Sequence, residues 1–228
     1  MKNLKLGVLL LPAFIGLNGA LQADPCPAGH CSKVNDGVYK ACKAEGRPTA
    51  YVVQADGSMC TCPCSCTGDG TSISGTSGEI SVESLLAGAL LETQAGPTPI
   101  VKKLSSPVEN DKAFEFTLSN GKKLLVSTNH PFIVRGGIVK PADQIQAGDE
   151  LLGREENSSI RVESIMPRRY TGTFHNVILD GKSATGADRV YLASGVQSGD
   201  WTIQSYRDLL NQNVALRKVI SSANMDSQ

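Results

Sequence analysis

Residues 113–132 read AFEFTLSNGKKLLVSTNHPF, and they carry the clearest structural signal in the chain. Two apolar-rich runs, 113–119 and 122–128, flank an Asn-Gly pair. Because Asn and Gly tolerate the positive φ angles of a type I′ turn, the pattern predicts a β-hairpin with that turn at Asn120 and Gly121. Further strands are predicted over residues 160–165, 174–179 and 190–193, and further turns at 136–137 and 180–181.

The composition favours a turn-rich β protein. The 228 residues include 23 Gly and 11 Pro, and 40% of them are hydrophobic. This apolar content excludes disorder of the whole chain. The 22 Lys and Arg residues balance the 22 Asp and Glu residues, so the basic excess typical of a protein that neutralises phosphates is missing, and no nucleic-acid partner is expected.

A short internal echo suggests two related halves. Residues 84–91 read SLLAGALL and residues 144–152 read QIQAGDELL, with an Ala-Gly pair in each. If the echo is structural, it implies two similar β units within one domain.

The N-terminus has the pattern of a secretory signal peptide over residues 1–23. Lys2 and Lys5 precede an apolar run from Leu6 to Leu17, and a small residue, Ala23, stands at the expected cleavage point. The run is shorter than the ~20 residues that span a bilayer, so no stable membrane anchor is expected. The sequence therefore predicts a secreted protein, either periplasmic or extracellular.

All seven cysteines lie near the N-terminus, at positions 26, 31, 42, 60, 62, 64 and 66. A segment as small as 24–65 needs staples, and disulfides are the usual staples of exported proteins. Metal binding, with His30 as a further ligand, is an alternative, but the C-x-C spacing is unlike that of zinc sites. We therefore predict a disulfide-rich module over 24–65, with one of the seven cysteines of the chain left over, and no metal or cofactor.

The rest of the chain divides into a β-rich domain over residues 66–205 and a C-terminal segment over 206–228. The run from Val214 to Ile220 has the spacing of an amphipathic helix, and a polar tail follows it.

Four motifs occur in an order that resembles the hedgehog/intein (Hint) family of autoprocessing domains. They are CTGDGT at 66–71, Ala-Gly at 87–88, LVSTNHPF at 125–132 and PADQIQAGD at 141–149. The resemblance covers about 140 of the 228 residues. It implies a mainly β, Hint-type fold with pseudo-twofold halves, preceded by the Cys-rich module and followed by a short C-terminal helix.

The resemblance also implies self-cleavage. Cys66 stands at the family's nucleophile position, where its thiol attacks the Ser65 carbonyl and converts the amide into a thioester. His130 is then the general acid that protonates the leaving amine, and Ser127 takes the place of the family's threonine beside the scissile bond. Water, or a small thiol or amine, is the expected acyl acceptor.

Other interpretations remain open. Splicing is disfavoured because residues 195–200, GVQSGD, lack the His-Asn pair that ends an intein, and Trp201 is no nucleophile. Cys66 could be a structural disulfide cysteine and His130 a core histidine, in which case the domain is a catalytically silent scaffold carrying a binding module. A cysteine peptidase acting on other proteins is a third interpretation. His175, where the family often has tyrosine, is expected to be structural.

Overall fold

The computed structural model describes residues 49–53, 56–63, 67–155, 158–182 and 186–221. The predicted signal peptide, residues 24–48 of the Cys-rich segment, and Cys66 lie outside these ranges. The predictions made for them are therefore not tested by the structure.

The described residues are mainly β, as predicted. The elements in chain order are β1 (Thr49–Val53), β2 (Met59–Pro63), β3 (Thr67–Gly68), β4 (Ser72–Gly75), β5 (Gly78–Ser81), the 3-10 helix η1 (Val82–Ser84), β6 (Leu90–Thr93), β7 (Gly96–Leu118), β8 (Lys123–Ser127), β9 (Pro131–Val134), β10 (Ile138–Pro141), η2 (Ala142–Gln144), β11 (Glu150–Leu152), β12 (Ser159–Leu179), η3 (Ala187–Arg189), β13 (Val190–Ala193), β14 (Val196–Gly199), α3 (Trp201–Ser205), α4 (Arg207–Gln212) and α5 (Val214–Ser221).

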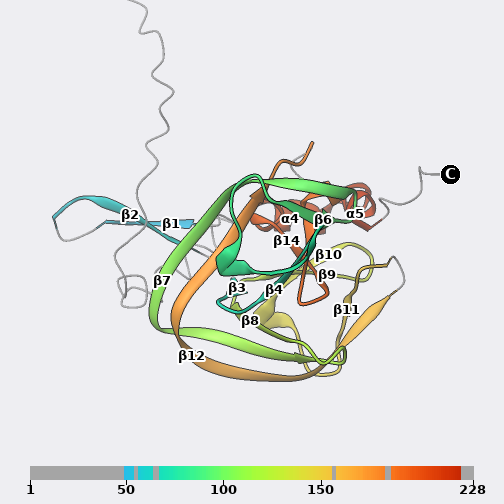
Figure 1. The fold of residues 1–228 in the computed structure, drawn as a ribbon, viewed down its shortest axis with the longest axis horizontal. Helices are drawn as coiled ribbons and strands as arrows, with labels where there is room; N and C mark the ends of the chain where they lie inside the picture. Colours follow the sequence, from blue (N-terminus) through green and yellow to red (C-terminus); the bar gives the residue numbers. More distant parts are fainter. Residues whose placement is uncertain (1–48, 54–55, 64–66, 156–157, 183–185, 222–228) are drawn as a thin grey trace, which may run out of the picture.

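These strands form two separate sheets. Strands β1 and β2 pair only with each other, and Figure 1 shows their hairpin projecting away from the rest of the molecule. The other twelve strands form one highly curved antiparallel sheet, in the order β10-β9-β14-β13-β4-β6-β7-β8-β3-β12-β11, with β5 alongside β4. The small strand β3 therefore lies between β8 and β12.

The longest elements, β7 and β12, wrap around the core as a curved two-stranded ribbon (Figure 1). The sequence predicts only two short strands within β12, over 160–165 and 174–179, and the single proline of β12, Pro167, lies between them. Proline cannot donate to a strand neighbour and is confined to strand edges. Pro107 and Pro167 are tolerated because each stands where its strand has one paired neighbour among the described residues.

The hairpin predicted at Asn120 and Gly121 is present, with Ala113 to Thr117 of β7 paired to Ser127 to Lys123 of β8. The predicted turn type is wrong. Gly121 has a φ of 77°, but Asn120 has no positive φ, whereas a type I′ turn needs both. The amide of Gly121 donates to the Leu118 carbonyl at 2.9 Å, so a four-residue turn with a left-handed glycine closes the hairpin.

The echo between residues 84–91 and 144–152 is structural. In each copy a 3-10 helix follows a short hairpin, and a glycine with positive φ, Gly88 at 86° or Gly148 at 93°, leads into the next strand. The hydrogen bonds repeat as well: Gly88 donates to Ile100 and Gly148 to Val162, both at 2.8 Å.

The two copies meet at β3 and β8. The Thr71 amide donates to the Gly68 carbonyl at 3.2 Å, and the His130 amide donates to the Ser127 carbonyl at the same distance. Counting four positions back from Thr71 and from His130 gives Thr67 and Val126 as equivalent residues, and these two residues are paired with each other. The pair therefore lies on the approximate twofold axis, which confirms the predicted pseudo-twofold halves.

The helical C-terminus is present and packs on the sheet. It begins at Trp201 and forms three short helices, whereas the sequence predicts one helix and a polar tail within residues 206–228. The carboxylate of Asp200 caps α3 by accepting from the Thr202 and Ile203 amides at 2.8 and 3.0 Å. The helices contribute a second core cluster, whose buried members are Ile133, Val139, Val190, Ile203, Leu210 and Ile220.

The hairpin of β1 and β2 contains the described part of the cysteine-rich segment. Cys60 is buried there and is disulfide-bonded. None of the helices formed by the described residues is long and apolar enough to cross a membrane.

Candidate functional site

The site predicted from the sequence is built around β3, which starts at Thr67, the residue that follows Cys66 in the chain. Thr67 is paired with Val126 of β8 on one side and with His175 of β12 on the other. Its buried hydroxyl donates to the His175 carbonyl at 3.2 Å. The start of the predicted processing domain is thus fixed between two neighbouring strands.

Ser127 and His130 are brought together at the end of β8. Ser127 is the residue after Val126, and its carbonyl accepts from the His130 amide at 3.2 Å. The His130 ring is buried edge-on against Phe132, with the ring centroids 4.9 Å apart. Its Nε2 lies 3.0 Å from the Ser198 hydroxyl of β14.

Burial sets the charge of this imidazole. With no charged partner to offset the loss of water, desolvation lowers the pKa of His130 to about 3. The ring is therefore neutral near neutral pH. In that state one nitrogen carries a proton and the other can accept one.

The loop after β3 is held in place by short polar contacts. The Thr71 hydroxyl donates to the Gly68 carbonyl at 2.7 Å, and the Gly70 amide donates to a Glu83 carboxylate oxygen at 3.0 Å. Gly70 has a φ of 79°, which a side chain would strain. This accounts physically for the Gly70-Thr71 pair in the first motif.

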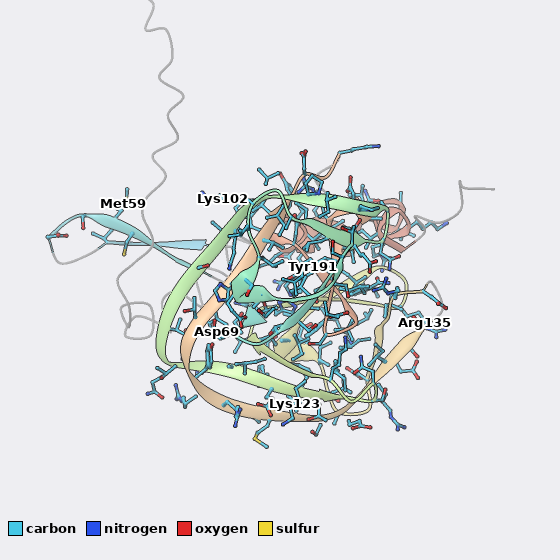
Figure 2. All side chains as sticks on the ribbon, in the orientation of Figure 1. Met59, Asp69, Lys102, Lys123, Arg135 and Tyr191 are labelled. Atoms are coloured by element: carbon cyan, nitrogen blue, oxygen red, sulfur yellow. The ribbon has the colours of Figure 1, made fainter. Side chains whose placement is uncertain are left out.

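A second polar cluster lies beside β3 and was missed by sequence reasoning. The Nε2 of His175 is 2.8 Å from Asp69 Oδ1, and its Nδ1 is 2.9 Å from the Ser105 hydroxyl. Asp69 Oδ2 also accepts from the Tyr170 hydroxyl at 2.7 Å and from the Thr173 amide at 2.8 Å. Figure 2 places Asp69 on the side of the core that faces the β7–β12 ribbon. No local sequence pattern indicates this cluster, because its members come from distant segments.

The cluster shifts the pKa values of two of its members. Desolvation alone would raise the pKa of Asp69, but the hydrogen bonds from Thr173, Tyr170 and His175 hold it below its usual value. Desolvation and the bond to Asp69 raise the pKa of Tyr170 to about 12. At neutral pH, Asp69 is therefore a carboxylate and Tyr170 a neutral donor.

Strand β14 carries the residues of the segment 195–200 into the C-terminal helices. Gln197 is buried and its amide nitrogen donates to the Gly153 carbonyl at 2.8 Å, while Ser198 lies against His130. The chain then continues through Asp200 into α3.

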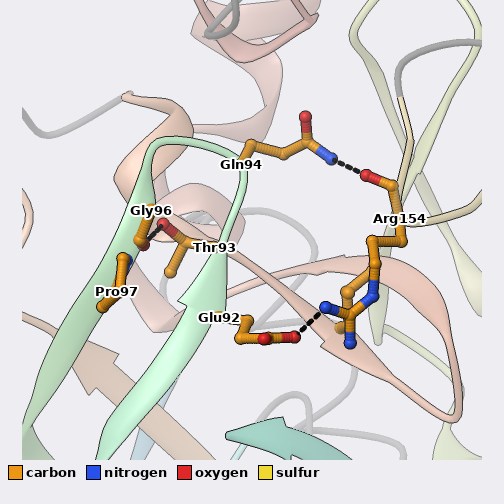
Figure 3. Close-up of a pocket in the computed structure, with 7 residues that line it drawn as sticks. Glu92, Thr93, Gln94, Gly96, Pro97 and Arg154 are labelled. Carbon is orange, nitrogen blue, oxygen red and sulfur yellow. Dashed lines mark hydrogen bonds and ion pairs between the residues drawn. The ribbon is translucent and has the colours of Figure 1, made fainter. Parts of the chain in front are cut away.

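One surface pocket lies apart from these residues, between β6, the start of β7 and Arg154 (Figure 3). Its volume is about 200 Å³. Glu92 is ion-paired with Arg154, and Gln94 donates to the Arg154 carbonyl at 3.4 Å. The polar groups of this pocket are thus paired with one another, and its volume is below the range of roughly 300–1,000 Å³ usual for ligand sites. No group of three or more His, Cys, Asp or Glu side chains within the described ranges could hold a metal ion.

Neither a family model nor a curated protein matches the sequence. Solved structures do match the fold. The gp41-1 intein is 15% identical with a TM-score of 0.50, and the match covers 60% of this chain and 98% of that structure. A bacterial intein-like domain from Clostridium thermocellum is 18% identical with a TM-score of 0.50, covering 59% and 98%. A DnaB intein from Synechocystis sp. PCC 6803 is 12% identical with a TM-score of 0.50, covering 60% and 98%.

The sequence identity of these three matches is low, so the likeness concerns the fold alone. Together with the internal repeat and the position of β3 on its axis, the matches establish that this chain has the hedgehog/intein (Hint) fold.

Proposed function

We propose that this chain is a secreted precursor that cleaves itself between Ser65 and Cys66. The observation that carries the proposal is the position of β3 in this Hint fold. Thr67, the residue after Cys66, is paired with Val126 of β8. Ser127 follows Val126 in the chain and begins the turn that leads to His130. The residue that follows Cys66 in the chain is therefore held next to the strand end that carries Ser127 and leads to His130, which supports the proposed roles of these residues.

The first step is an N-to-S acyl shift. The Cys66 sulfur attacks the Ser65 carbonyl carbon, the C–S bond forms, and the C–N bond to the Cys66 nitrogen breaks. The leaving nitrogen must gain a proton, and the thiol must lose one. The neutral His130 ring has one protonated and one accepting nitrogen, so it can take up the thiol proton and give one to the leaving nitrogen, which balances the step.

Ser127 has a supporting role in this proposal. Its hydroxyl would donate to the carbonyl oxygen of the scissile bond, where negative charge develops as sulfur attacks. Serine retains the donor of the family's threonine while having a less restricted χ1.

The thioester is then resolved by water or by a small thiol or amine rather than by splicing. Residues 195–200, GVQSGD, contain no His-Asn pair of the kind that ends an intein. The segment beyond Gly199 is anchored by the buried side chains of Ile203, Leu210 and Ile220. Cleavage on the N-terminal side alone would release the cysteine-rich segment 24–65. The buried, disulfide-bonded Cys60 supports a stapled module in that segment.

The test is the intact mass of the chain from residue 24 onward, measured over time with and without added thiol. We expect two fragments that meet at Ser65 and Cys66, faster release with thiol or hydroxylamine, and no release in Cys66→Ala. Cys60→Ala with thiol added is the matched control, because it removes a cysteine but leaves the predicted nucleophile.

A chain that stays whole under all these conditions would contradict the proposal and would favour the silent scaffold. A chain that cuts added Cys66→Ala protein would instead indicate a peptidase acting on other molecules. Counting free thiols in the denatured protein tests separately whether one of the seven cysteines is unpaired.

A further inference from the structure

The cluster of Ser105, His175 and Asp69 has the arrangement of a nucleophile, a base and an orienting carboxylate. Three different parts of the chain supply its members: β7, β12 and the loop after β3. Ser105 and His175 are directly paired in the sheet, and His175 is paired on its other side with Thr67. The cluster therefore occupies neighbouring strands beside the start of the predicted processing domain.

The hydrogen bonds determine which imidazole nitrogen carries the proton. Asp69 is a carboxylate and can only accept, so His175 Nε2 donates to it over 2.8 Å. Nδ1 is then the accepting nitrogen, and the Ser105 hydroxyl donates to it over 2.9 Å. The direction of both bonds is the one that a serine nucleophile needs.

The carboxylate is itself held rigidly. Asp69 Oδ2 accepts from the Tyr170 hydroxyl and from the Thr173 amide, which leaves Oδ1 aimed at the imidazole. The His175 side chain is 6% exposed, whereas Ser105 is exposed. A buried base behind an accessible hydroxyl is the arrangement by which hydrolases activate serine, with the two ring nitrogens exchanged relative to the usual triad.

We propose that Ser105, His175 and Asp69 form an acyl-accepting serine site whose donor is a thioester. Ser105 Oγ attacks the thioester carbonyl carbon, so that a C–O bond forms and the C–S bond breaks. The hydroxyl proton passes to His175 Nδ1 and from there to the departing sulfur, which leaves as a thiol. Water, deprotonated by the same nitrogen, then hydrolyses the ester to a free acid and restores the Ser105 hydroxyl.

Two sources could supply the acyl group: a free thioester, or the one that the proposed function forms on Cys66. The second source rests on the proposed function, and it would make Ser105 the acyl acceptor of self-cleavage. Thr67, the neighbour of Cys66 in sequence, and Ser105 pair with opposite sides of the same residue, His175.

The first arm of the test uses the Cys66→Ala chain, which cannot form its own thioester at that position. Incubation with the acetyl thioester of a small thiol, followed by peptide mass mapping, should place one acetyl group on Ser105. The adduct should be lost in Ser105→Ala and reduced at least tenfold in His175→Gln. Ser164→Ala, which removes an exposed serine of the neighbouring strand β12, is the matched control and should be labelled like its parent.

Because water hydrolyses the ester, samples are quenched with acid at short times and the free thiol released from the thioester is counted as well. The site would be overturned if neither acetylation nor thiol release depends on Ser105, or if both are the same in His175→Gln. Asp69 is a positioning residue and needs a separate readout. The imidazole ¹⁵N spectrum of His175 should show the proton on Nε2 in the parent chain and lose this preference in Asp69→Asn. An unchanged tautomer would overturn the role of Asp69.

The second arm follows the chain with Cys66 intact. Spontaneous release of the free acid should slow at least tenfold in Ser105→Ala, while release triggered by added thiol should be unchanged. Equal spontaneous release, together with labelling in the first arm, would assign the site to free thioesters. If added thiol releases nothing from any variant, the proposed function has failed, and the first arm still decides whether the serine site exists.

Discussion

At the scale of single residues, the most consequential group is the buried imidazole of His130. Its pKa of about 3 lies well below the 6.5 of an unperturbed histidine. Between these two values the unfolded chain binds a proton at this position and the folded chain does not. By linkage, the free energy of unfolding then falls as the pH falls through that window.

We expect His130 to make the free energy of unfolding fall by about 1.4 kcal/mol per pH unit between roughly pH 6 and pH 4. His130→Gln, which keeps a polar partner for Ser198, should lack this contribution. Urea unfolding of both chains across that range gives the difference directly, because contributions from the carboxylates are common to both. Parallel pH profiles for the two chains would contradict the buried, neutral state of the ring.

Two substitutions at Ser127 test the proposed chemistry: alanine removes the hydroxyl, and threonine keeps it and adds a methyl group. Ser127→Ala should slow thiol-triggered cleavage by about 100-fold, since it removes a donor to the developing oxyanion. Ser127→Thr should cleave at least as fast as the parent, because it keeps the hydroxyl and restricts χ1. Rates measured by intact mass under the same thiol concentration decide this, and an alanine variant as fast as threonine would remove Ser127 from the mechanism.

At the scale of elements, the repeated unit of hairpin, 3-10 helix, glycine turn and strand is the best-defined building block. Burial follows the same order in both copies: Leu85 and Leu91 are buried in the first, and Ile145 and Leu151 in the second. Each copy also closes on the β7–β12 ribbon through its glycine amide. The first copy therefore bonds to the ribbon near the start of β7, at Ile100, and the second copy near the start of β12, at Val162.

Equivalent positions in the two copies should respond alike to substitution. Gly88 and Gly148 have positive φ, and a Cβ added at either would meet no atom within 4 Å. Gly88→Ala and Gly148→Ala should therefore each lower the free energy of unfolding through backbone strain alone, by about 1–2 kcal/mol. Chemical denaturation measures both, with Ala147→Ser as an exposed control. A difference between the two glycines larger than the strain itself would contradict their equivalence.

At the scale of the whole molecule, the C-terminal helices complete the core rather than forming an appendage. Leu210 of α4 is fully buried, whereas the adjacent Leu209 is 50% exposed. Substituting alanine for Leu209 or for Leu210 removes the same atoms from the same helix, so a comparison of the two variants separates the effect of burial from that of helix propensity.

Leu210→Ala should cost about 2–5 kcal/mol of unfolding free energy, whereas Leu209→Ala should change it by less than about 0.5 kcal/mol. Fluorescence of the single tryptophan, Trp201, and far-ultraviolet circular dichroism should report the same transition in both variants. A separate early transition at Trp201 would show that the helices unfold on their own.

Sequence reasoning succeeded where a signal was local. The Asn-Gly hairpin, the strand over 190–193 and the Ala-Gly repeat each lie within a short window, and short-range pattern is what such windows encode. It failed on the full length of β7 and β12, whose exposed middle sections and prolines hide the alternation of a strand.

The polar clusters show the same division. His130 was identified because Ser127 and Pro131 adjoin it, but its partner Ser198 was not, since the two are 68 positions apart. Asp69 and Ser105 are 106 and 70 positions from His175. Only the folded sheet brings such residues together, so an isolated histidine gave no hint of its neighbours.

The pairing of Thr67 with Val126 has a consequence for the origin of the fold. Equivalent strands that pair with each other across a twofold axis are what an isologous homodimer of a half-length ancestor would contain. In a single chain the two strands of such a contact are encoded separately. The position that follows Cys66 and the one that precedes Ser127 can therefore carry different side chains, here threonine and valine.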